Sequence, residues 1–132
     1  MENSVELDLH SKIGIIALAG RQSAAKIQQS VTESFKMNAE QMRLFSRIMT
    51  LVDLSELEGF DAGAQIASIR GLGVDNFDRL AVYWKEDRLG KTKAALIKKV
   101  VELSGKRDSI KFFSERDKAI NWLKEELRIL ED

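Results

Sequence analysis

The stretch LVDLSELEGFDAGAQ, Leu51 to Gln65, joins a short apolar run to a region with a helical pattern. The run IMTLVDL is apolar and partly β-branched, which indicates a central strand. Asp61 is a suitable N-cap for the helix that follows, with Ile66 and Ile69 expected on its buried side. A strand that leads into a helix is the repeating unit of α/β proteins, so this stretch decides the fold class.

Two strands and one long helix are expected before this stretch. SVELDLH alternates apolar and polar residues, which predicts a half-buried strand, and SKIGIIALAG predicts a more buried partner that ends at Gly20. Ser23 then caps a helix over about 23 to 45, and two helices broken at a capping box of Asn38 and Gln41 are the alternative. The expected inward stripe of this helix is Ile27, Val31, Phe35, Asn38, Met42 and Phe45.

The remaining residues predict a loop, two strands and two helices. GLGVDNFD is rich in turn residues, RLAVYW and SIKFF have strand character, and KTKAALIKKVVELSG predicts a helix that ends at a left-handed Gly105. Ser114 with Asp117 is expected to cap the final helix. The order β-β-α-β-α-β-α-β-α predicts an α/β fold, with a mixed sheet of about five strands and four helices in one domain over residues 1–132.

Composition excludes several functional classes. The chain has 21 basic and 21 acidic residues, whereas a nucleic-acid-binding domain is usually clearly basic. It has no cysteine, so a disulfide, a thiolate metal site and a thiol nucleophile are excluded. No apolar run is long enough to span a membrane, and the acidic N-terminus MENSVELDLH argues against a signal peptide. A cytoplasmic location is therefore expected.

Two motifs resemble nucleotide-binding sites, but each lacks a glycine that such a site needs. LGKTK ends like a phosphate-binding loop, but Lys85 stands where that loop needs a glycine. GLGVDN has Asn76 at the third glycine position of a dinucleotide fingerprint, and a strand follows it where a helix is needed. His10 is the only histidine, lies near a predicted turn and has no nucleophile motif to serve. No cofactor and no metal site are expected.

Three further features have an ordinary structural interpretation. Asp53, Glu56, Glu58 and Asp61 could form an acid pair, but they are expected to be solvated turn residues and a helix cap. Residues 85–107 carry a local excess of basic side chains, which most often form the solvated face of a helix. Trp84 and Trp122 are expected at the edge of the core.

Three segments resemble the SpoIIAA-like family of bacterial proteins, which are relatives of the STAS domain. They are LVDLSELEGFDAGA, FDRLAV and IKFFSERDKAINWL, and the resemblance extends from about Ile13 to Leu127. It implies a mixed sheet of about five strands with four helices. These motifs consist mostly of core and turn residues, so they specify the fold more closely than the activity.

The resemblance also implies a missing switch. STAS proteins that antagonise anti-sigma factors carry a pattern like D-L-S at the strand end, and their next helix begins D-S-S-G with a serine that is phosphorylated. Asp53, Leu54 and Ser55 match the first pattern, and Asp61 matches the aspartate of the second. Ala62 and Gly63 occupy the serine positions, so the usual phosphate acceptor is absent.

These observations leave three hypotheses. The first is a non-enzymatic regulatory or protein-interaction domain, whose partner loop contains Asp53, Ser55, Glu58, Asp61, Ala62 and Gly63. The second is a small-molecule or lipid-binding module, because the broader family resembles the Sec14 type, in which apolar ligands lie between sheet and helices. The third is an enzyme that relies on carboxylates and lysines. A homodimer is compatible with all three, and nothing in the sequence decides it.

Overall fold

A five-stranded mixed sheet with the order β1-β2-β4-β6-β7 forms the centre of the fold. The structure is a computed structural model that describes residues 2–132. The strands are β1 Ser4–Asp8, β2 Ile13–Ala17, β4 Met49–Asp53, β6 Arg79–Tyr83 and β7 Ile110–Phe113. β1 is antiparallel to β2, and the other neighbours are parallel. The expected antiparallel hairpin at one edge of an otherwise parallel sheet is confirmed.

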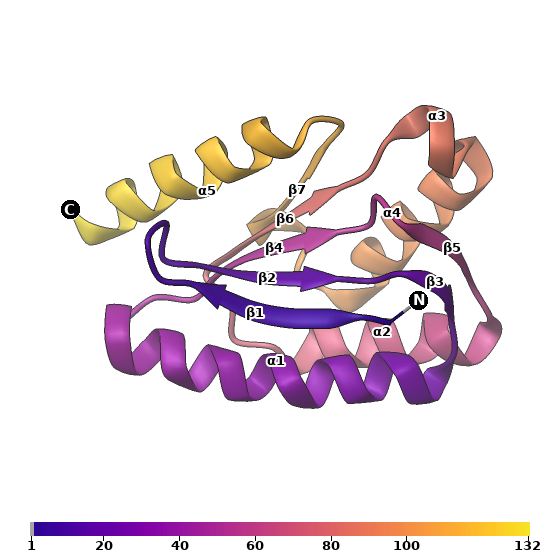
Figure 1. Cartoon of the computed structure of the whole chain (residues 1–132), viewed down its shortest axis with the longest axis horizontal. Helices are drawn as coiled ribbons and strands as arrows, with labels where there is room; N and C mark the ends of the chain where they lie inside the picture. Colours follow the sequence, from indigo (N-terminus) through magenta and orange to yellow (C-terminus); the bar gives the residue numbers. More distant parts are fainter. Residues whose placement is uncertain (1) are drawn as a thin grey trace.

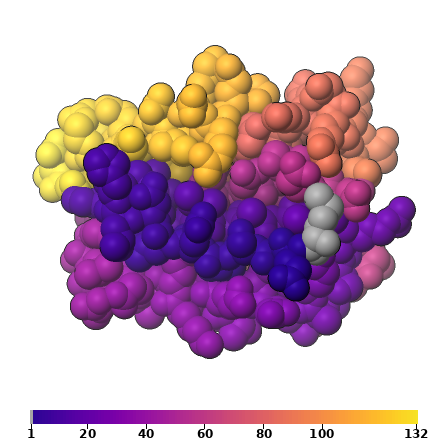
Figure 2. Space-filling model, in the orientation of Figure 1, coloured from indigo at the N-terminus to yellow at the C-terminus, as the bar shows by residue number. Residues whose placement is uncertain are grey.

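Helices cover both faces of this sheet, and one face carries more helices than the other. The helices are α1 Ala24–Phe45, α2 Ala62–Val74, α3 Glu86–Leu89, α4 Lys91–Ser104 and α5 Arg116–Glu131, with a 3-10 turn, η1, at Arg107–Ser109. In Figure 1, α1 and α2 run below the sheet and α5 lies along its upper side. α2 packs between α1 and α4, so these three helices form one layer. Figure 2 shows the same layers with side chains filled in.

The side chains of each parallel strand alternate between two separate hydrophobic clusters. Met49 and Leu51 of β4 belong to the cluster under α5. Val52 of the same strand packs against the larger cluster, which the other helices cover. A strand that is buried on both faces must be apolar on both, which is why the parallel strands are nearly continuous hydrophobic runs.

Helix α1 is unbroken, but its buried face differs from the predicted one. Ser23 caps it through a hydrogen bond from Lys26 N to Ser23 Oγ of 3.2 Å, and no break occurs at Asn38. Phe35 and Met42 are 42% and 47% exposed, so the expected inward stripe is wrong at these positions. The buried positions include four polar residues, Ser30, Ser34, Asn38 and Gln41.

The close approach of α1 to the sheet explains this polar inner face. A Cβ atom on Gly14 of β2 would lie 2.4 Å from Met37 Cε and 2.7 Å from Gln41 Nε2. Gln41 Oε1 also accepts a hydrogen bond from Met49 N at 3.2 Å. Small or hydrogen-bonded side chains fit this space, whereas Phe35 and Met42 are directed along the seam between α1 and α2.

A second, two-stranded sheet corrects the predicted loop between Asp53 and Asp61. β3 Gly20–Gln22 and β5 Leu57–Phe60 pair in parallel, with Gln22 opposite Phe60. Gly20, expected to end a strand, begins β3 with a positive φ of 74°. Leu57 is 3% exposed and anchors β5 in the core. The acids that flank this single buried leucine made the segment look like a solvated turn.

Helix α2 is longer than predicted and buries small residues. Asp61 caps it as expected, but the helix continues to Val74, so the predicted loop at 71–78 is wrong over its first half. Ile66 is 52% exposed, whereas Ala64 and Ala67 face the core. The cause is close packing against α1, because a Cβ on Gly71 would lie 2.7 Å from Val31 Cγ2. Large side chains are excluded from that seam.

The elements after α2 mostly agree with the sequence-based expectations. Gly105 has a φ of 77° at the end of α4, as predicted, and Trp84 is buried. The predicted cap of the final helix is wrong, since α5 follows Glu115 with no side-chain cap hydrogen bond. The short helix α3 and the 3-10 turn were not expected from the sequence.

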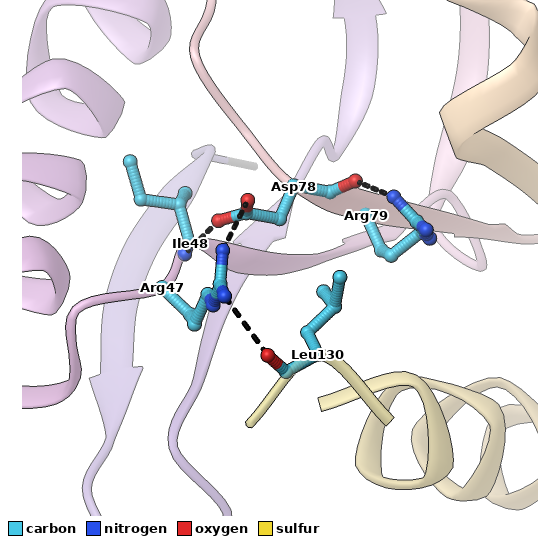
Figure 3. Close-up of polar contacts among 5 residues, drawn as sticks. All are labelled: Arg47, Ile48, Asp78, Arg79 and Leu130. Carbon is cyan, nitrogen blue, oxygen red and sulfur yellow. Dashed lines mark hydrogen bonds and ion pairs between the residues drawn. The ribbon is translucent and has the colours of Figure 1, made fainter. Parts of the chain in front are cut away.

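A cluster of polar contacts connects the C-terminal helix α5 to the amino edge of the sheet (Figure 3). Asp78 Oδ2 accepts a hydrogen bond from Ile48 N at 2.7 Å, and Asp78 Oδ1 lies 3.6 Å from Arg47 Nη1. Arg47 Nη2 donates to Leu130 O of α5 at 2.8 Å. The cluster links the turn after α1, the start of β6 and the end of α5, so its role is structural.

A second polar contact lies inside the protein, where α1 meets the end of α2. Asp75 is 7% exposed, and its Oδ1 accepts a hydrogen bond from Asn38 Nδ2 at 2.7 Å. Asn38 Oδ1 has no hydrogen-bond partner among the described residues. Burial raises the pKa of the Asp75 carboxyl, and hydrogen bonds from Asn76 N, Phe77 N and Asn38 oppose that rise.

Gly71→Ala should destabilise the fold despite the better helix propensity of alanine. Alanine gains up to about 1 kcal/mol over glycine inside a helix. Overpacking against Val31, which is stiff because it is β-branched, costs about 1–3 kcal/mol. Chemical denaturation should therefore show a net loss. Gly73→Ala is the control, because its Cβ would meet only Ser104 O at 3.6 Å.

The same substitution in a Val31→Ala background tests the cause. With the valine methyl groups removed, Gly71→Ala should be neutral or stabilising. An equal loss of unfolding free energy in both backgrounds would contradict the proposed clash.

The stability of the variant Asp75→Asn, compared with that of the parent, should increase as pH rises. Because the folded-state pKa of Asp75 is raised, its contribution to stability is fully present below the ordinary Asp pKa and is lost as pH rises through the folded value. The unfolding free energy of Asp75→Asn relative to the parent should therefore increase as pH rises above the ordinary Asp pKa of about 3.9. Asp87→Asn, at an exposed position, serves as the control. A relative loss of stability with rising pH would refute this assignment.

Candidate functional site

The predicted partner loop begins where β4 ends, at the carboxyl edge of the parallel sheet. Asp53 Oδ2 lies 3.5 Å from Arg116 Nε of α5, and Asp53 Oδ1 accepts a hydrogen bond from Ser55 N at 2.9 Å. Ser55 is itself half-buried. This carboxylate thus fixes the local turn and one end of α5.

The next two acidic residues, Glu56 and Glu58, have different surroundings from Asp53. Glu56 Oε2 lies 3.1 Å from Arg88 Nη2 of α3, and about half of each side chain is exposed. Glu58 is exposed on β5. An exposed ion pair of this kind contributes little to stability.

The last three residues of the predicted loop form the start of α2. Asp61 Oδ1 accepts a hydrogen bond from Ala64 N at 2.7 Å, which confirms the predicted cap. Ala62 is exposed, and Gly63 lies against α1, where a Cβ would be 3.2 Å from Ala24 Cβ. The two positions that match the serines of the D-S-S-G pattern are therefore occupied by an exposed alanine and a tightly packed glycine.

These six residues share one edge of the molecule but do not converge on a catalytic centre. Asp53 contacts α5, and Asp61 caps α2, so the two carboxylates serve different helices. Within residues 2–132, no group of three or more acidic or histidine side chains could hold a metal ion. The parallel strands follow one direction across the sheet, so it lacks the topological switch point at which open α/β sheets form a ligand crevice.

An apolar cavity of about 120 Å³ lies between the sheet and the helices α1, α2 and α4. Side chains of β2, β4 and β6 form one wall, and the helices form the other. Its lining residues are Ile16, Leu18, Ile27, Ser30, Val31, Ser34, Val52, Leu54, Phe60, Ser68, Gly71, Leu72, Asp75, Leu80, Val82, Ile97, Val100 and Val101. The partner-loop residues predicted from the sequence are not among them.

Three of the polar residues in the cavity wall are satisfied by the protein itself. Ser30 Oγ accepts a hydrogen bond from Asn3 Nδ2 at 2.9 Å, and Ser34 Oγ donates to Val31 O at 2.8 Å. Asp75 is held by Asn38. The cavity therefore presents a mostly apolar surface. Sequence reasoning missed it because serines on a helix suggest a solvated face, and its other residues come from distant segments.

The basic segment 85–107 does not form a uniform charged face. Arg88 pairs with Glu56, and Lys98 Nζ lies 6.0 Å from the centre of the Phe112 ring. Lys106 Nζ lies 5.9 Å from the Phe77 ring centre and donates to Asp75 O at 2.9 Å. Several of these cations thus cover aromatic or polar groups of the fold.

The remaining predicted candidates have ordinary surroundings. His10 is exposed in the β1–β2 turn, where its backbone N donates to Asp8 Oδ1 at 3.0 Å. The centres of the Trp84 and Phe112 rings are 5.3 Å apart, and those of Trp122 and Phe113 are 5.7 Å apart. Among residues 2–132, every helix is too short or too polar to cross a membrane.

Comparison with known proteins agrees with this architecture. The family model described as SpoIIAA-like matches residues 13–124. A crystal structure of an uncharacterised protein of the DUF3478 family from Shewanella loihica PV-4, which has a SpoIIAA-like fold, is similar with a TM-score of 0.62 and 18% identity. That match covers 92% of this chain and 91% of the other. No curated protein matches significantly. Because the family model covers most of the chain, the chain belongs to the SpoIIAA-like family.

Proposed function

We propose that this chain is a non-enzymatic binding domain that holds a small apolar ligand in the cavity between the sheet and the helices. The observation that carries the proposal is the cavity itself, about 120 Å³ with a mostly apolar wall. Ligand pockets are typically concave and apolar with few polar groups. The separated carboxylates at the carboxyl edge favour binding over acid–base catalysis.

The volume limits the size of the ligand. An engineered apolar cavity of about 150 Å³ in another protein stays dry and binds benzene. The present cavity is of similar size, so it would accommodate a benzene-sized molecule or one end of an acyl chain. A complete lipid would need the helix layer to move away from the sheet.

Filling the cavity should abolish ligand retention. Ser34 is 4% exposed and lines the cavity, so Ser34→Leu places a larger apolar side chain in the ligand space. Native mass spectrometry of protein purified from its host should show a bound apolar molecule in the parent and none in this variant. Glu33→Leu, at an exposed position on the same helix, should keep the ligand.

A clean unliganded mass for the parent, with no rise in melting temperature in the presence of small apolar compounds, would overturn the proposal. Circular dichroism of both variants separates loss of ligand from loss of fold.

A regulatory protein-interaction role for the segment Ser55 to Ala64 is the second candidate. Glu58, Asp61 and Ala62 are exposed, and the pairing of β5 with β3 holds the segment in place. Such a surface could meet a partner without a large ordering cost. Because Ala62 and Gly63 carry no hydroxyl group, a partner would not be controlled by phosphorylation at the position used by the better-known relatives.

Phosphosite mapping tests this independence from a kinase. No phosphate is expected at residues 61–64, which contain no acceptor, or at the two nearest serines. Ser55 is half-buried, and Ser68 lines the internal cavity. Mass-spectrometric mapping of protein from its host should therefore show both serines unmodified. Phosphate on either one would indicate a displaced switch.

A further inference from the structure

An apolar groove runs along the outer side of the seam between α1 and α2. It consists of two adjoining hollows of about 390 and 450 Å³, and both include Val74. Four large apolar side chains around it are exposed: Phe35 at 42%, Met42 at 47%, Ile66 at 52% and Val74 at 66%. We call this feature the outer groove. A cluster of exposed apolar residues of this kind commonly marks an interaction site.

The groove has the shape of a seat for a helix. Along α1 it is bordered by Gln28, Thr32, Phe35, Ala39 and Met42, which are spaced three and four residues apart and so lie on one stripe. The ends of this stripe, Gln28 and Met42, are 14 positions apart, which is a length of about 21 Å at 1.5 Å per residue. A partner helix of about four turns would fit along it, which corresponds to the helix-in-groove mode of recognition.

The charges at its rim favour one kind of partner. Arg70 lines one hollow, and Lys36 is exposed on the outward side of α1 next to the stripe. Among the described residues, neither hollow is lined by an acid. Glu33 borders a different pocket on the β1 side of α1, and Glu40 pairs with Arg43. The outer groove therefore combines an apolar floor with a basic rim.

We propose that the outer groove binds an amphipathic helix of a partner protein whose flanking side chains are acidic. Such a helix places apolar residues against Phe35, Ile66 and Val74 and carboxylates near Arg70 and Lys36. A second copy of the chain is disfavoured, because a two-fold contact through this face sets the basic rim against itself. This proposal does not depend on the ligand assigned to the internal cavity.

A pair of synthetic peptides provides the direct test. Both have about 18 residues with leucine at i, i+3, i+4 and i+7 positions, and the other positions are mainly glutamate in one peptide and lysine in the other. Fluorescence anisotropy should show at least tenfold tighter binding of the glutamate peptide. Amide chemical shifts in the labelled protein should change around Phe35, Met42, Ile66 and Val74.

Two isoleucines give a matched pair of variants. Ile66→Glu in the outer groove should weaken binding of the glutamate peptide at least tenfold. Ile129→Glu on α5, where the side chain is 53% exposed compared with 52% for Ile66, should leave it unchanged. Arg70→Glu should weaken the glutamate peptide and strengthen the lysine peptide. Circular dichroism confirms that each variant is folded.

Several results would overturn the proposal. They are equal binding of the two peptides, no binding of the glutamate peptide at millimolar concentration, and shift changes confined to another surface. Self-association in sedimentation that Ile66→Glu abolishes would assign the groove to a second copy. Binding to phosphatidylcholine–phosphatidylglycerol vesicles in place of the peptide would assign it to a membrane surface. Retention of the cavity ligand is measured separately, so either proposal can fail without the other.

Discussion

The arrangement of the crossover helices is the constraint on which the other features depend. The parallel strands β2, β4, β6 and β7 follow one another across the sheet, and the helices between them, α1, α2 and α4, lie in one layer. Only α5 remains to cover the opposite face. One consequence is that the carboxyl edge lacks the topological switch point at which open α/β sheets commonly bind ligands. Another is that the thick layer on one face must pack three helices against the sheet at once, and this is where the cavity lies.

The contact between Val31 and Gly71 separates two different spaces. Both residues line the internal cavity, and both also line the outer groove. The wall between the cavity and the outer groove is therefore only one pair of residues thick at this point. Because Gly71 has no side chain that could fill a gap, a change in the spacing of α1 and α2 alters both the cavity and the outer groove.

Local patterns predicted the elements of the fold well and the faces of the helices poorly. Ser23 and Asp61 cap helices and Gly105 ends one, since each acts through its own backbone neighbours. The orientation of α1 depends on the distance to Gly14, and that of α2 on Val31, which no periodicity within one helix can report. β5 was missed because a single buried residue, Leu57, holds it among acids. Pairing with β3, in which Gly20 lies opposite Leu57 and Gln22 opposite Phe60, supplies the rest.

The candidate sites also differ in how far the sequence alone predicts them. The segment from Asp53 to Gly63 could be singled out from the sequence because its residues are contiguous and follow a strand. The cavity could not, because its wall is assembled from positions between Ile16 and Val101 and includes serines that suggest solvent exposure. The stripe predicted for α1 bears on the second proposal as well. Phe35 and Met42 are exposed and lie outside the core, and together with Ile66 and Val74 they form the apolar cluster on which the proposed helix-binding groove rests.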